Sequence, residues 1–187
     1  MLKEKTIEND LEYLKQVSRP VDFKKDDVKE IAKELKDFCT NHSLSMALAA
    51  VQLGIPLRIL YLKKLDDSRM DDDDYDENRV LINPRILSEE GETLYWEACA
   101  SCGDLTGLVK RPYKIRLEYQ DEDGNTHEEV FEGLPATVVC HELDHFEGVL
   151  HIEIAIEVHT YTYEERVELR KREPYKVLRK TGEYIHP

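Results

Sequence analysis

The sequence predicts an α+β fold in which mostly antiparallel sheets surround a buried central helix. Two segments, residues 26–39 and 134–146, have the apolar spacing or the continuous apolar run that is typical of helices. Shorter segments between them read as strands, and an Asp-Gly turn joins two of them. Because strands joined by tight turns run antiparallel, this order of elements favours α+β over a parallel α/β fold.

The first predicted helix, residues 26–39, is amphipathic. Its apolar positions recur at helical spacing, with Lys and Glu between them: Val28, Ile31, Ala32, Leu35, Phe38 and Cys39. This pattern predicts a helix with one face on the core.

The strands are predicted from apolar runs and from alternation. Residues 57–62 and 80–82 read as buried strands, and Asn83-Pro84 is expected to break the second of them. Residues 114–119 alternate with period two, and residues 127–131 return after the Asp-Gly turn. We therefore expect a β-hairpin between the two helices.

Length and charge limit the classes of function. With 187 residues and a net charge of −14, the chain is expected to form a single domain over residues 1–187 that does not bind DNA. Residues 65–79 hold eight acids and two arginines, and we interpret them as an acidic loop. No apolar run is long enough for a membrane span, and no signal peptide is evident. We expect a cytoplasmic location, or an organelle interior after removal of a transit peptide.

The clearest chemical motif is His141-Glu142-Leu143-Asp144-His145 in the second predicted helix, which has Pro135 near its first turn. Histidines four apart lie on the same face of a helix, so both can bind one metal ion. Glu142 between them is placed to take a proton from a water molecule. Because the histidines interrupt an apolar stretch, they need polar partners inside the protein.

A catalytic metal usually has three protein ligands, so a third ligand is required. Glu164 and Glu165 are suitable candidates downstream, and Cys99 and Cys102 are suitable candidates upstream. Spacing alone does not choose between them.

Three segments carry a resemblance to a known family. They are Ser45-Met46-Ala47-Leu48-Ala49-Ala50-Val51-Gln52, then Glu97-Ala98-Cys99-Ala100-Ser101, then Cys140-His141-Glu142-Leu143-Asp144-His145-Phe146-Glu147-Gly148. In order and spacing they resemble the motifs GxGLAAxQ, EGCLS and QHExDHxxG of the peptide deformylase family. The similarity extends over almost the whole chain, from about residue 10 to residue 177.

The resemblance implies a metal centre in which Cys99, His141 and His145 are the ligands. It implies one divalent ion, Fe²⁺ in the first place, with Zn²⁺, Ni²⁺ or Co²⁺ as substitutes. Cys99 and Cys102 form a Cys-x-x-Cys pair, but no βαβ unit surrounds it and no second such pair exists, so we interpret Cys102 as a bystander thiol.

The resemblance also implies the reaction, which is removal of the formyl group from the N-terminal formyl-methionine of nascent polypeptides. Glu142 would be the general base, and the Gln52 amide and the Ala100 N–H would stabilise the oxyanion. Glu97 and Arg111 would form an ion pair that fixes the loop bearing Cys99.

The expected substrate pocket departs from the family pattern. By alignment its residues are Met46, Ala47, Tyr95, Leu134, Thr137 and Val138. Ser45, Ala47 and Ala98 replace usual glycines, Ala100 replaces a leucine, and Thr106 stands where many relatives have arginine. These changes predict an altered substrate preference, or reduced activity, in a protein that keeps its metal.

Two alternatives and one partner stay open at this point. The chain could be a deformylase-like metalloprotein with another substrate or little turnover, or a zinc endopeptidase with Glu164 or Glu165 as third ligand. Residues 160–187 are expected to form a C-terminal helix and tail. Because residues 166–180 hold seven bases and two acids, they could contact the ribosome, as the basic C-terminal helix of bacterial deformylases is thought to do.

Overall fold

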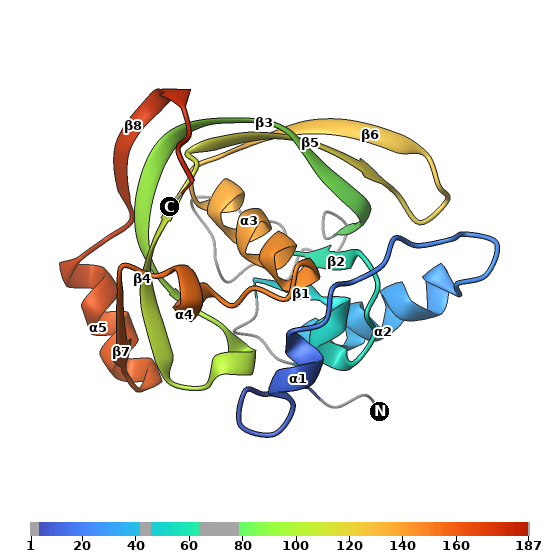
Figure 1. Cartoon of the computed structure of the whole chain (residues 1–187), viewed down its shortest axis with the longest axis horizontal. Coiled ribbons are helices and arrows are strands. Elements are labelled where there is room, and N and C mark those ends of the chain that lie inside the picture. Colours follow the sequence, from blue (N-terminus) through green and yellow to red (C-terminus); the bar gives the residue numbers. More distant parts are fainter. Residues whose placement is uncertain (1–3, 42–45, 64–78, 187) are drawn as a thin grey trace.

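The computed structural model describes residues 4–41, 46–63 and 79–186. A curved sheet wraps around a helix, with further helices at the sides (Figure 1). The helices are α1 (Leu11–Leu14), α2 (Val28–Asn41), η1 (Ala50–Leu53), η3 (Ala100–Cys102), α3 (Leu134–Phe146), α4 (His151–Ile154) and α5 (Tyr163–Arg172). The strands are β1 (Ala47–Ala49), β2 (Ile59–Leu62), β3 (Arg79–Ala98), β4 (Leu105–Arg111), β5 (Lys114–Gln120), β6 (Thr126–Glu132), β7 (Glu157–Thr160) and β8 (Lys176–Glu183).

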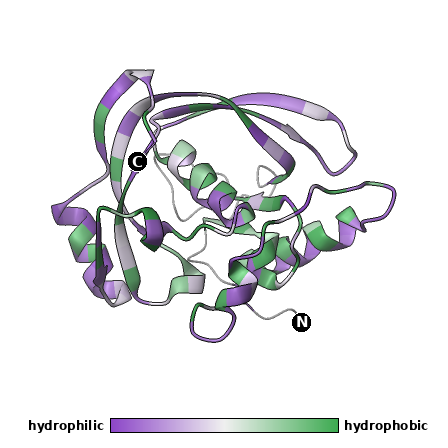
Figure 2. Cartoon of the chain, viewed as in Figure 1, coloured by the Kyte–Doolittle hydropathy of each residue, from purple (hydrophilic) through white to green (hydrophobic). Residues whose placement is uncertain are grey.

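The long strand β3 organises the sheet. The main path runs β1-β2-β3-β4-β7, while β5 and β8 also pair with β3, and β6 pairs with β5. Each of these strand pairs is antiparallel, as the sequence predicted. Edge strand β6 is largely hydrophilic and exposed, which suits a strand with water on one side (Figure 2).

The expected break at Asn83-Pro84 is wrong, because β3 continues through it. The pairing of β3 with β5 shifts register between Ile82 and Arg85, and Asn83 has a φ of 50°. Asn tolerates this left-handed conformation, and Pro84 has no N–H to give to a ladder. The two residues therefore make an irregularity within one long strand, where the strand was expected to end.

Helix α3 lies in the concave side of the curved sheet (Figure 1). Its bounds are those expected, and it begins after Gly133 with a proline in its first turn. Its buried residues, among them Val139 and Phe146, pack with Leu81, Ile115 and Leu117 of the sheet. This packing brings the His-Glu-x-x-His segment into the interior.

Helix α2 covers a second core cluster with its apolar stripe. Ala32, Leu35 and Cys39 are fully buried. The Asp27 carboxylate accepts a hydrogen bond from Glu30 N at 3.2 Å and so caps the first turn, which explains why α2 begins at Val28. The amphipathic helix expected at residues 26–39 is thus confirmed, displaced by two residues.

The C-terminal segment differs from the expected helix and tail. Helix α5 ends at Arg172, and after Pro174 the chain forms β8 along β3. The acidic loop expected at residues 65–79 lies outside the described residues except for Arg79. Among the described helices, none has the length and apolar character that crossing a membrane requires.

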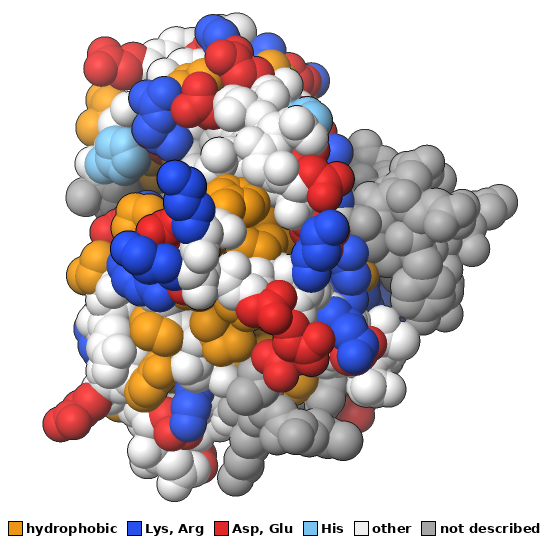
Figure 3. Space-filling model, turned by 90° about the vertical axis from the view of Figure 1, so that its right-hand side faces the viewer, with side chains coloured by type: hydrophobic (Ala, Val, Ile, Leu, Met, Phe, Trp, Pro, Cys, Tyr) orange, Lys and Arg blue, Asp and Glu red, His pale blue; other side chains and the backbone are white. Residues whose placement is uncertain are grey.

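Basic and acidic side chains are mixed on the surface. On the face in Figure 3 they lie close together. Ion pairs elsewhere in the described residues follow the same mixture, such as Arg79 with Glu129 at 2.6 Å and Lys36 with Glu122 at 3.0 Å. Most described cations are thus already matched by carboxylates.

Candidate active site

Helix α3 carries two histidines and a glutamate into the interior. His145 is 1% exposed and Glu142 is 5% exposed, while His141 is partly buried. The rings of His141 and His145 lie edge to face with their centroids 5.1 Å apart, because residues four apart stack on one face of a helix.

Strand β3 brings Cys99 to the two histidines. Cys99 is in extended conformation directly after β3 and caps the short helix η3. One ligand atom from each of Cys99, His141 and His145 lies within 4.8 Å of the others, and Cys99 Sγ is 3.4 Å from His145 Nε2. Within residues 4–41, 46–63 and 79–186, this is the one group of three or more potential ligands so close together.

The other candidate ligands have different roles. Glu165 caps α5, since its carboxylate accepts a hydrogen bond from Thr162 N at 2.8 Å. Glu164 is exposed on the same helix. Cys102 is buried beside Cys99, whose hydrogen bond lowers the pKa of the Cys102 thiol. The geometry therefore favours Cys99 as the third ligand.

Behind the cluster, Glu97 joins Arg111 to His141. Arg111 donates from Nε and Nη2 to the two oxygens of Glu97 at 2.9 and 3.0 Å, and His141 Nδ1 lies 2.8 Å from Glu97 Oε2. Burial opposes ionisation of Glu97, but Arg111 and His141 outweigh it and lower the pKa of Glu97. The carboxylate thus holds the proton of His141 on Nδ1 and leaves Nε2 for a metal ion.

Two buried polar atoms in this cluster have no partner among the described residues. They are Oε2 of Glu142 and Nδ1 of His145. Burial raises the pKa of Glu142 to about 8. A buried polar atom without a partner is costly, so an unpaired carboxylate oxygen beside three convergent ligands fits a place for a metal ion and its water.

The residues present fit a divalent metal centre. One thiolate and two imidazoles form a donor set that suits zinc and several other transition metals. Three protein ligands also leave a coordination position for water or substrate, which is typical of catalytic centres.

Gln52 faces this cluster from η1. Its Oε1 accepts a hydrogen bond from Ala49 N at 2.9 Å, which fixes the orientation of the amide. Its Nε2 then donates to Ser101 Oγ at 3.0 Å and lies 3.4 Å from Cys99 Sγ. Ala100 begins η3, and the first N–H groups of a helix have no partner within it.

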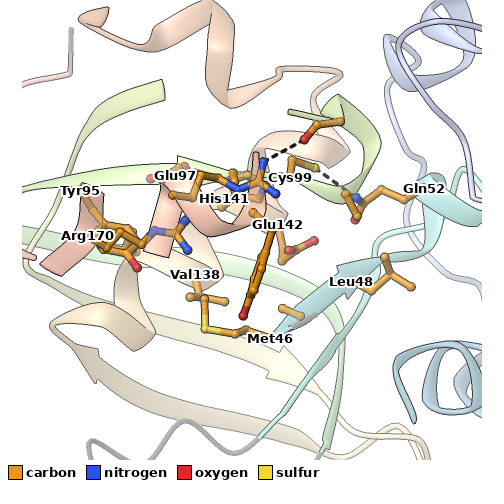
Figure 4. A pocket seen from close by; sticks show the side chains of 17 residues that line it. Met46, Leu48, Gln52, Tyr95, Glu97, Cys99, Val138, His141, Glu142 and Arg170 are labelled. Atoms are coloured by element: carbon orange, nitrogen blue, oxygen red, sulfur yellow. Dashed lines mark hydrogen bonds and ion pairs between the residues drawn. The ribbon is translucent and has the colours of Figure 1, made fainter. Parts of the chain in front are cut away.

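A pocket with a cavity volume of about 260 Å³ opens onto the cluster (Figure 4). Of the six residues expected there, five line it: Met46, Ala47, Tyr95, Thr137 and Val138. Leu134 is the exception. It lies one helical turn before Val138 and packs against the core cluster. Met46 and Ala47 pack against the same cluster and also line the cavity, so a role for Leu134 at the edge of the pocket stays a prediction.

Sequence reasoning missed one wall of the pocket. Tyr163, Arg166 and Arg170 of α5 line it. Arg170 lies beside Tyr95, away from Gln52, and its guanidinium is 5.0 Å from the centroid of the Tyr95 ring (Figure 4). The available signal was the spacing of the two arginines, four residues apart within the basic segment, which we had interpreted as a ribosome contact.

Comparisons with known proteins agree with this geometry. A family model described as polypeptide deformylase matches residues 4–160. The chain is 39% identical over 160 residues to a peptide deformylase of Novosphingobium aromaticivorans, which covers 75% of this chain and 82% of that protein. It is 36% identical over 143 residues to a peptide deformylase of Maricaulis maris, and this match covers 75% of this chain and 78% of that protein.

Solved structures with a similar fold include two bacterial peptide deformylases. One is the class I type b enzyme of Acinetobacter baumannii with Met-Ala-Ser bound, with a TM-score of 0.71, 28% identity and coverage of 82% of this chain and 98% of that one. The other is from Legionella pneumophila, with a TM-score of 0.72, 25% identity and coverage of 91% and 92%. The chain therefore belongs to the polypeptide deformylase family.

Proposed function

We propose that this chain removes the formyl group from the N-terminal formyl-methionine of nascent polypeptides. One observation carries the proposal: the unpaired Glu142 carboxylate oxygen lies buried beside Cys99, His141 and His145 at a pocket. A related structure holds Met-Ala-Ser, which is the peptide that deformylation of formyl-Met-Ala-Ser would leave.

Cys99, His141 and His145 would hold one divalent metal ion. We propose Fe²⁺, for which Zn²⁺, Ni²⁺ or Co²⁺ could substitute, because a donor set of one thiolate and two imidazoles accepts each of them. When bound, the ion polarises the formyl oxygen and makes water acidic enough to react at neutral pH.

Glu142 would transfer the proton between the attacking water and the leaving amine. Its carboxylate would take a proton from the attacking water and pass it to the amine of the departing methionine. Its burial supports this role, because a carboxyl group with a raised pKa both accepts and releases a proton near neutral pH.

Gln52 and Ala100 would stabilise the negative charge that develops on the formyl oxygen. The amide of Gln52 cannot turn freely, since Ala49 N and Ser101 Oγ hold its two ends. A donor held in place before the reaction needs no reorganisation when the charge appears. Glu97 and Arg111 would keep His141 in the required tautomer.

The test is an assay of iron-loaded protein, prepared without oxygen, on formyl-Met-Ala-Ser, acetyl-Met-Ala-Ser and unmodified Met-Ala-Ser. Release of formate from the first peptide alone is expected. Cleavage of internal peptide bonds would instead favour an endopeptidase, which the capping role of Glu165 does not support. Preference for another formylated compound would show a changed substrate.

We also propose a contact with the ribosome in the cytoplasm or in an organelle, where formylated chains are made. The bases left for it are Lys171, Arg172, Lys176, Arg179 and Lys180, because Arg166 and Arg170 line the pocket. Lys171 and Arg179 are already paired with Glu168 and Glu92. Lys176 and Lys180 are exposed and have no ion pair among the described residues, and Arg172 is exposed with a longer pair to Glu173, at 3.4 Å. These three are the better candidates.

A further inference from the structure

One face of α5 forms a basic wall of the pocket. Arg166 and Arg170 are separated by one helical turn and both line the cavity, while Glu164 and Glu168 are exposed. Two guanidinium groups therefore border the space where a substrate would extend from the metal centre.

Both guanidinium groups are held in place by backbone carbonyls. Arg170 donates from Nε and Nη2 to the carbonyl oxygen of Trp96 at 3.0 and 2.8 Å. Arg166 donates from Nη1 to the carbonyl oxygen of Gly103 at 3.1 Å. These bonds fix the positions of the two side chains but do not neutralise their charge, and each group keeps further N–H donors.

The two pocket arginines differ from all other arginines that the structure describes. Each of the others has a carboxylate oxygen within 3.4 Å: Arg19, Arg58, Arg79, Arg85, Arg111, Arg116, Arg172 and Arg179. No described carboxylate comes within 3.5 Å of Arg170, and the nearest to Arg166 is the exposed Asp104, at 3.9 Å. In a chain with 40 acids and 26 bases, two unmatched arginines at the pocket are an exception.

The carboxylates of the pocket itself do not pair with Arg166 or Arg170. Glu97 is bound to Arg111 and His141. Glu142 points into the metal centre and has an unpaired oxygen there. Within the described part of the chain, the one carboxylate that pairs with this wall is therefore that of the exposed Asp104, 3.9 Å from Arg166. A partly buried cation attracts an anion more strongly than an exposed one does.

We propose that Arg166 and Arg170 bind a carboxylate of the substrate, so that the enzyme favours formyl peptides with a negative charge close to the formyl-methionine. The planar guanidinium matches a carboxylate through two N–H donors. The carboxylate is either an acidic side chain at the second or third residue or the C-terminal carboxylate of a short peptide. This inference rests on the proposed deformylation, because it assigns the preference to the same pocket.

Two pairs of peptides separate the two sources. Formyl-Met-Ala-Ser with a free C-terminus is compared with its C-terminal amide, and formyl-Met-Glu-Ser-amide is compared with formyl-Met-Gln-Ser-amide. We expect about tenfold higher kcat/KM for the charged member of at least one pair, since hydrogen bonds to charged groups are worth at least that factor. The ratio should fall as salt is added.

Variants of Arg166 test the direct contact. Arg166→Gln should raise KM for the charged member of each pair by a larger factor than KM for its uncharged partner, so that the ratio of kcat/KM within each pair falls toward one. Arg166→Lys should restore part of the preference, and Arg166→Glu should shift it toward formyl-Met-Lys-Ser-amide. The matched control is Arg172→Gln, whose side chain is 71% exposed on the same helix and lines no part of the pocket.

A binding measurement tests the role of the two arginines separately from the proposed deformylation. Trp96 is the single tryptophan of the chain, and Arg170 binds its carbonyl oxygen, so its fluorescence reports ligands at this wall. Titration of the metal-loaded protein with the deformylated products of both pairs, Met-Ala-Ser with its amide and Met-Glu-Ser-amide with Met-Gln-Ser-amide, gives the charge preference without turnover. Equal dissociation constants within both product pairs, or kcat/KM ratios within twofold for both peptide pairs, would overturn the role of the arginines. Absence of all turnover together with a preserved binding preference would instead overturn deformylation alone.

Discussion

At the scale of single residues, the identity of the third ligand decides the chemistry. Cys99→Ala should lose stoichiometric metal, because two histidines alone hold a divalent ion weakly, whereas Cys102→Ala and Glu164→Ala should keep it. Elemental analysis of the purified variants measures this directly. Full metal content in Cys99→Ala would contradict the proposed metal centre.

Glu142 separates metal binding from catalysis. Its carboxylate is not one of the three grouped ligands, so Glu142→Gln should bind metal and fold as the parent does. Without the base, the rate of formate release should fall by about 10²–10⁴-fold. Near-parental turnover in this variant would show that another group takes the proton.

Tyr95 is expected to weaken the preference for methionine. Its ring lies against Tyr175, with centroids 5.6 Å apart, and beneath Arg170, so it is held at the pocket wall. A ring there occupies space that an aliphatic residue would leave free, and filling a hydrophobic pocket by about a methylene changes preference by about tenfold.

We therefore predict a lower ratio of kcat/KM for formyl-Met over formyl-Ala peptides than in an ordinary deformylase assayed alongside. Tyr95→Ile should recover part of that ratio. Equal or stronger methionine preference in the parent would show that the Tyr95 ring does not limit the pocket.

At the scale of elements, two glycines at the ends of α3 test how this helix is held. Gly133 and Gly148 both have a φ of 68°. A Cβ at Gly148 would lie 2.4 Å from the carbonyl oxygen of Lys15, whereas a Cβ at Gly133 would meet nothing within 4 Å. Both substitutions by alanine strain the backbone, but only one also pushes the N-terminal segment away from α3.

Gly148→Ala should thus lower the free energy of unfolding by more than Gly133→Ala, for which about 1 kcal/mol is expected from backbone strain alone. Urea unfolding of the two variants beside the parent gives the comparison. Equal losses would mean that the contact between Lys15 and Gly148 adapts without cost.

The elements also show what sequence could predict. Helix α3 was predicted with its bounds because a long apolar run with Pro135 near its start is a local signal, and the ligands followed from the resemblance. The basic wall was missed because α5 meets the pocket only through distant pairings, those of β7 with β4 and of β8 with β3.

At the scale of the whole molecule, the distribution of charge predicts how the chain meets the ribosome. Charge reversal of Arg172, Lys176 and Lys180 to Glu should weaken the association of the protein with ribosomes. The association that remains should depend less on salt concentration. Cosedimentation at several salt concentrations measures this. Reversal of Lys24, Lys25 and Lys29, which are exposed just before α2 and in its first turn, is the control. Unchanged association in the first variant, or none in the parent, would rule out this contact.

The strands before and after α5 both pair with the sheet, and this limits how far α5 can move. A segment that swings open over an active site needs a free end or a pair of hinges, and opening is easiest where few backbone bonds must break. Helix α5 has a strand on each side of it, with β7 bonded to β4 and β8 bonded to β3, and Cys99 directly follows β3. It is therefore a fixed wall, and a peptide is selected by its fit to a rigid opening on arrival rather than by a closure that follows binding.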